Sequence, residues 1–74
     1  MITKTEFTNT GIKVHVNAWK GRNVNFSIFI EDQEYDSGTT LDCDLESEAA
    51  YWARVTVADI EAGRLKKVND YWYI

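Results

Sequence analysis

The side chains that most often carry covalent chemistry are scarce in this sequence of 74 residues, which has one histidine, His15, and one cysteine, Cys43. A cysteine nucleophile needs a base within hydrogen-bond reach and normally a third group that orients the base. Nothing in the sequence brings the two together, because His15 falls on the polar side of an alternating segment and Cys43 directly precedes a helical one. We therefore expect Cys43 to be a small buried or half-buried hydrophobe, His15 to be a surface residue, and the protein not to be an enzyme.

A metal site is the second chemistry to consider, because Asp32, Glu34, Asp36 and Gly38 resemble the start of a calcium-binding loop. The spacing does not fit. With Asp32 as the first position, Gly38 is the seventh residue where the loop needs glycine at the sixth, and Cys43 is the twelfth where it needs glutamate. One histidine and one cysteine also fall short of the four ligands usual for zinc. We expect no metal ion and no cofactor.

Acidic residues are concentrated in one stretch of the chain. Twelve acidic against eight basic residues give a net charge of −4, which opposes direct binding to nucleic acid, where basic patches supply most of the affinity. Between Asn23 and Ala53 there is no Lys or Arg. The acidic residues of this stretch are Glu31, Asp32, Glu34, Asp36, Asp42, Asp44, Glu46 and Glu48.

Two interpretations of this acidic stretch stay open. The residues from Asp42 to Glu48 precede or begin a helix, so a cap and a solvated first turn account for most of them. A segregated negative field also raises the association rate with a positive partner. On that interpretation the stretch docks on a basic protein, for example a nucleic-acid-binding protein whose cationic groove it occupies as a nucleic-acid mimic.

The elements that would position these residues follow from hydrophobic patterning. Period-two alternation predicts strands over residues 12–19 and 24–31, joined by a turn at 20–23. Residues 3–8 favour an earlier strand with a turn at 8–11, and Asp32-Gln33 favours a turn into a short fourth strand, 34–37, ended by Gly38. Residues 68–74 predict a closing strand, which a turn at Asn69-Asp70 would shorten.

Residues 44–63 predict one amphipathic helix. Asp42 or Asp44 can cap its start, Gly63 suits the left-handed position after its end, and the basic residues at 64, 66 and 67 suit its C-terminal carbonyls. Its core-facing residues share one arc, namely Leu45, Ala49, Trp52, Ala53, Thr56, Val57 and Ile60.

Together these elements predict a single α+β domain over residues 1–74. Its fold is an antiparallel sheet of three to five strands with one amphipathic helix packed on one face, in the order β-β-β-(β)-α-β. A lone cysteine forms no intramolecular disulfide, and the sequence shows neither a secretory signal nor an apolar run long enough to span a membrane. These features favour a cytoplasmic location and no membrane partner.

Apolar residues expected on the surface are a second indication of binding. Tyr51 and Val55 fall on the back of the helix, and Trp19 and Phe29 fall on the outer face of the sheet. Exposed aromatic clusters often mark protein interfaces. The alternative for Trp19 and Phe29 is that they cover each other across the hairpin, or that a terminal segment folds over them. For Tyr51 and Val55, a contact with a second copy or with a partner is an equal alternative to a plain solvated surface.

The short length, the acidic charge, the single cysteine and the strand-rich plan with one helix resemble small inhibitor proteins that bacteriophages encode against host defence, including anti-CRISPR proteins. The likeness is one of size and composition, so it transfers no functional residue. It implies a non-enzymatic inhibitor that docks on a larger, basic, nucleic-acid-handling defence protein in the host cytoplasm. The alternative is a structural or assembly protein that forms a homo-oligomer through the helix back or the edge strands.

Overall fold

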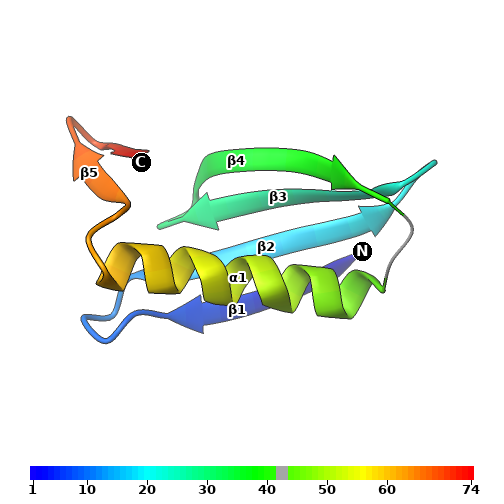
Figure 1. The fold of residues 1–74 in the computed structure, drawn as a ribbon, viewed down its shortest axis with the longest axis horizontal. Coiled ribbons are helices and arrows are strands. Elements are labelled where there is room, and N and C mark those ends of the chain that lie inside the picture. Colours follow the sequence, from blue (N-terminus) through cyan, green and yellow to red (C-terminus); the bar gives the residue numbers. More distant parts are fainter. Residues whose placement is uncertain (42–43) are drawn as a thin grey trace.

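The structure is a computed structural model that describes residues 1–41 and 44–74. Four antiparallel strands form the main sheet in the order β1-β2-β3-β4, one helix crosses one face of it, and two short strands form a separate sheet (Figure 1). The α+β fold predicted from the sequence is therefore confirmed. The elements are β1 (Ile2–Phe7), β2 (Lys13–Lys20), β3 (Val24–Ile30), β4 (Gln33–Thr40), α1 (Leu45–Glu61), β5 (Lys66–Val68) and β6 (Tyr71–Tyr73).

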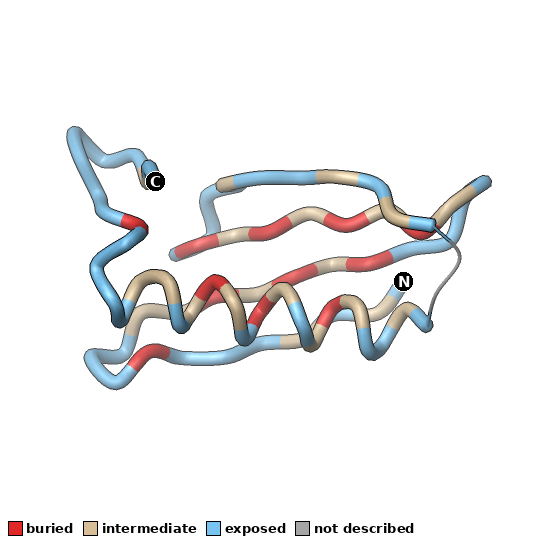
Figure 2. The backbone as a smooth tube through the Cα atoms, viewed as in Figure 1, coloured by how far each residue is buried: buried red, intermediate tan, exposed pale blue. Residues whose placement is uncertain are grey.

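The core lies between α1 and the central strands β2 and β3, whose residues alternate between buried and partly exposed (Figure 2). Ala49 and Ala53 of α1 are fully buried, and their small side chains let the helix backbone approach the sheet. Each fully buried valine or isoleucine contributes about 1.5–3 kcal/mol to folding. The buried hydrophobic residues are Val14, Val16, Ala18, Val24, Phe26, Ile28, Ile30, Ala49, Ala53 and Leu65.

Helix α1 begins and ends where the sequence predicts. The Asp44 side chain accepts a hydrogen bond from the backbone N–H of Ser47 at 2.9 Å, which makes Asp44 the N-cap. Gly63 has a φ of 78°, the left-handed conformation expected just past a helix end. The basic residues that were expected near the C-terminal carbonyls of α1 have other positions. Lys66 lies in β5, and Arg64 bonds to the side chain of Asp59 at 2.8 Å. No basic residue occupies the last turn of α1.

The fourth strand is longer than predicted. It runs from Gln33 to Thr40 and passes through Gly38, which was expected to end it. Gly38 faces Phe26 of β3, and a Cβ atom at Gly38 would lie 2.8 Å from Cζ of the Phe26 ring. The glycine therefore gives the ring space within a continuing strand. The turn before β4 is also one residue earlier than predicted, at Glu31 and Asp32, which both have positive φ.

The C-terminal segment does not close the main sheet as predicted. Among the described residues, strand β5 pairs only with β6, through a turn at Asn69 and Asp70 whose φ angles are 51° and 69°. Two consecutive residues with positive φ are typical of a type I′ hairpin turn, for which Asn and Asp are favourable. The expected turn thus divides the segment into a separate hairpin, held to the core by buried Leu65 and by Trp72.

Candidate binding surface

The acidic stretch does not form one patch in space. Glu31 and Asp32 lie at the turn between β3 and β4, whereas Asp44, Glu46 and Glu48 lie at the start of α1. Strand β4 runs between these two ends of a molecule whose longest dimension is 35 Å (Figure 1). Asp42, a further predicted binding residue, and Cys43 lie outside the described residues.

Most of the described acidic residues already have intramolecular partners. The carboxylate of Glu46 lies 2.8 Å from the ammonium of Lys4 on β1. At the other end of the molecule, Asp32 lies 3.5 Å from Lys13, and Glu31 lies 3.3 Å from Lys67 on β5. A partner that engaged these carboxylates would first have to compete with the protein's own lysines.

Asp44 and Glu48 have structural contacts in α1. The Oδ2 atom of Asp44 accepts hydrogen bonds from the backbone N–H and the hydroxyl of Ser47, both at 2.9 Å. These bonds stabilise the charged form and hold the pKa of Asp44 below its ordinary value. Glu48 accepts a hydrogen bond from the indole Nε1–H of Trp52 at 2.6 Å.

Glu34 and Asp36 differ from the other acidic residues. Both are exposed on β4, at the edge of the main sheet, and neither forms an ion pair with any described residue. Asp36 accepts a hydrogen bond from the backbone N–H of Ser37 at 2.9 Å, which fixes its position without neutralising it. Burial and the charges of Asp36 and Asp59 raise the pKa of the neighbouring Tyr35 hydroxyl. The edge of the sheet is therefore negative where β4 begins.

Trp19 and Phe29 lie on the face of the sheet opposite α1, but they do not cover each other. In the pairing of β2 with β3, Trp19 lies opposite Asn25 and Phe29 lies opposite His15. The rings of His15 and Phe29 stack at 4.7 Å with 5° between their planes. Trp19 remains 38% exposed. His15 is also less exposed than expected, since only 17% of its side chain is accessible.

Tyr51 and Val55 lie on α1, separated by the sheet from Trp19 and Phe29. Tyr51 is 47% exposed and meets the ring of Trp52 edge-on at 5.2 Å, whereas Val55 is half-buried. The four predicted aromatic and apolar binding residues therefore belong to two opposite faces. Phe29 is the cross-strand partner of Glu34 on β4, so the sheet face opposite α1 borders one of these two acidic residues.

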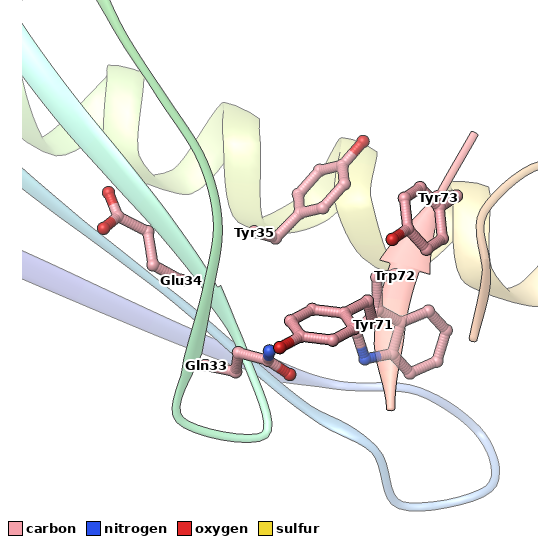
Figure 3. Close-up of a pocket in the computed structure, with 6 residues that line it drawn as sticks. All are labelled: Gln33, Glu34, Tyr35, Tyr71, Trp72 and Tyr73. Carbon is pink, nitrogen blue, oxygen red and sulfur yellow. The ribbon is translucent and has the colours of Figure 1, made fainter. Parts of the chain in front are cut away.

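An aromatic cleft beside β4 was not predicted as a site. It has a volume of about 220 Å³ and lies between the start of β4 and the C-terminal hairpin (Figure 3). The sequence did carry a signal, the run Tyr71-Trp72-Tyr73, but it was assigned to a closing strand. The lining residues are Gln33, Glu34, Tyr35, Tyr71, Trp72 and Tyr73.

Comparison with protein-family models, with curated proteins and with solved structures gives no match. Within residues 1–41 and 44–74, no three His, Cys, Asp or Glu side chains are grouped so that they could hold a metal ion. In the same part of the chain, no helix has the length and apolar character needed to cross a membrane.

Proposed function

We propose that this protein is a non-enzymatic binding protein that docks on a larger, basic, nucleic-acid-handling protein and blocks it. The observation that carries the proposal is the edge of the main sheet. There β4 presents Glu34 and Asp36, without ion-pair partners among the described residues, next to a cleft with four aromatic side chains. Unpaired negative charge beside aromatic anchors suits a positively charged protein surface.

The contrast among the acidic residues supports this placement. Engaging Glu31, Asp32 or Glu46 would cost the protein an existing ion pair. Engaging Glu34 or Asp36 breaks no such pair, so the full attraction of these charges is available to a partner. Aromatic side chains next to them can supply the buried contact area that charges at the rim do not.

A panel of purified CRISPR effector nucleases tests the proposal, because such proteins hold nucleic acid in positively charged channels and are the targets of the inhibitors that the sequence resembles. Binding to the immobilised protein is measured with free effector and with effector loaded with target DNA. We expect at least one effector to bind, DNA loading to prevent that binding, and the protein to inhibit cleavage stoichiometrically. Failure to bind any effector, or equal binding to the DNA-loaded form, would contradict the proposal.

A matched pair of variants tests the role of charge in the proposed binding. Glu34→Lys changes the charge on the edge strand β4, and Glu6→Lys makes the same change on β1, the opposite edge. We expect Glu34→Lys to lower the association rate with the effector by about three- to tenfold at low salt and Glu6→Lys to lower it much less. The difference should shrink at about 1 M salt, where screening shortens to about 3 Å. Equal effects of the two variants would show that only net charge matters.

A further inference from the structure

We infer that the aromatic cleft between β4 and the C-terminal hairpin binds the side chain of one arginine presented by a partner protein. This inference rests on the proposed function, because it names the residue of the basic partner that the edge of the sheet accepts. It concerns the site formed by Tyr35 of β4 with Tyr71, Trp72 and Tyr73 of β6.

The dimensions of the cleft suit a single side chain. Its volume of about 220 Å³ is below the roughly 300–1,000 Å³ of pockets that enclose small-molecule ligands. Tyr71 and Tyr73 are each 56% exposed, so the cleft opens to the surface. Figure 3 shows Tyr35 on the hairpin side of β4, Gln33 at the start of the same strand, and Tyr71, Trp72 and Tyr73 on the hairpin. A side chain extending from another protein can enter such a cleft.

The negative charge near Tyr35 favours a bound cation. Asp36 and Asp59 both raise the pKa of the Tyr35 hydroxyl, after the larger effect of its burial, but the Asp59 carboxylate is already paired with Arg64 at 2.8 Å. Asp36 has no ion pair with a described residue. The Glu34 carboxylate projects to the other side of the strand in Figure 3, so it adds a more distant negative charge.

The positive residues around the cleft are largely neutralised. Arg64 bonds to Asp59 at 2.8 Å, and Lys67 lies 3.3 Å from Glu31. Lys66 is the remaining nearby cation, and it is the cross-strand partner of Tyr73 in the hairpin. Its positive charge opposes a bound cation, so removing that charge should strengthen arginine binding, whereas removing a nearby negative charge should weaken it.

Arginine fits this chemistry better than an apolar residue or lysine. The faces of tyrosine and tryptophan rings attract cations, and the planar guanidinium stacks on such faces and is more weakly hydrated than an ammonium. Gln33, Tyr35, Tyr71 and Tyr73, which line the cleft, also carry an amide and three phenol hydroxyls. A hydroxyl or amide oxygen that reaches the bound guanidinium can accept a hydrogen bond from it, which an apolar occupant cannot donate.

The test uses N-acetyl-arginine amide as the probe and N-acetyl-citrulline amide as its uncharged isostere. Each is titrated into the ¹⁵N-labelled protein while the three indole N–H signals are followed by NMR. Trp72 lies in the cleft, whereas Trp52 donates to Glu48 within α1 and Trp19 lies on the far face of the sheet. We expect arginine to shift the Trp72 signal saturably, and citrulline to leave all three unchanged.

Variants identify the cause of the shift. Tyr71→Leu should weaken arginine binding about tenfold, whereas Tyr71→Phe keeps the ring and should bind nearly as well. Asp36→Asn keeps a hydrogen-bond acceptor for Ser37 and should weaken binding, and Lys66→Met should strengthen it. Unchanged Trp19 and Trp52 signals in each variant confirm that the fold is intact.

Equal shifts with arginine and citrulline, or no saturable shift of Trp72, would overturn the inference. The two proposals fail separately. If the effector binds the protein but arginine does not enter the cleft, the proposed function survives and this inference is wrong. If arginine enters the cleft but no basic effector binds, the cleft is an arginine site and the proposed function is wrong.

Discussion

The Asp44 carboxylate caps α1, and its bonds to Ser47 hold its pKa below the ordinary value. A depressed pKa in the folded state means that the unfolded state binds the proton more tightly. The stabilisation from Asp44 is therefore fully present above the ordinary aspartate pKa of about 3.9 and is lost as the pH falls through the lower folded pKa.

Asp44→Asn isolates this effect, because asparagine also caps helices well but does not titrate. We expect the melting temperature of the wild-type protein to exceed that of Asp44→Asn at neutral pH. The difference should shrink as the pH is lowered from about 4 toward about 2. Thermal unfolding followed by circular dichroism over this range measures it. A difference that does not depend on pH would contradict a role for the charge.

Gly38 is the second residue whose role is local. A Cβ atom at this position would lie 2.8 Å from the ring of Phe26, which is 6% exposed and stacks on Trp52 at 4.8 Å. Gly38→Ala should therefore lower the free energy of unfolding by about 1–3 kcal/mol, the usual cost of overpacking. Urea denaturation measures the change. Gly21→Ala is a control, since its close neighbour is the end of an amide side chain, that of Asn25, and not a buried ring. Equal stability of Gly38→Ala and the wild type would show that the ring can move aside.

Among the secondary-structure elements, the sequence correctly predicted those whose formation depends on local residue patterns. The strict alternation in β2 and β3 and the caps of α1 are local signals, and the structure confirms these elements. The extent of β4 depends on a contact with Phe26 from a different strand, which no local pattern shows. The separation of β5 and β6 from the main sheet likewise depends on the Asn69-Asp70 turn and on the packing of Trp72 against the core.

The candidate site was predictable only in part. Composition identified the acidic stretch, but pairing across the fold separates Glu34 and Asp36 from Glu31, Asp32 and Glu46. The aromatic cleft arises because the C-terminal hairpin lies beside β4, a tertiary arrangement that the run Tyr71-Trp72-Tyr73 does not reveal by itself.

Helix α1 offers the alternative function, self-assembly, through the exposed side chain of Tyr51 and the half-buried Val55. If this face joins two copies, Tyr51→Glu combined with Val55→Lys should convert a dimer to a monomer, because buried charges without partners oppose association. Size-exclusion chromatography with light scattering at low and high salt measures the mass. A wild-type monomer under both conditions would contradict self-assembly and leave the face without a homodimer role.

For the whole molecule, three surfaces compete as the binding face. On the sheet face opposite α1, Phe29 is already stacked on His15. On the helix, Tyr51 contacts Trp52 within the same element. The edge at β4 brings Glu34 and Asp36 together beside a cleft with four aromatic side chains, whereas the sheet face has Phe29 beside Glu34 alone.

The proposed binding face is tested most directly by mapping the contact surface on the ¹⁵N-labelled protein mixed with an effector of the proposed class, by the loss of backbone amide signals to cross-saturation from the unlabelled partner. We expect losses confined to residues 33–40 and 66–73, which form β4 and the C-terminal hairpin. Losses centred on Trp19 and Phe29, or on Tyr51 and Val55, would contradict this expectation and place the binding face elsewhere.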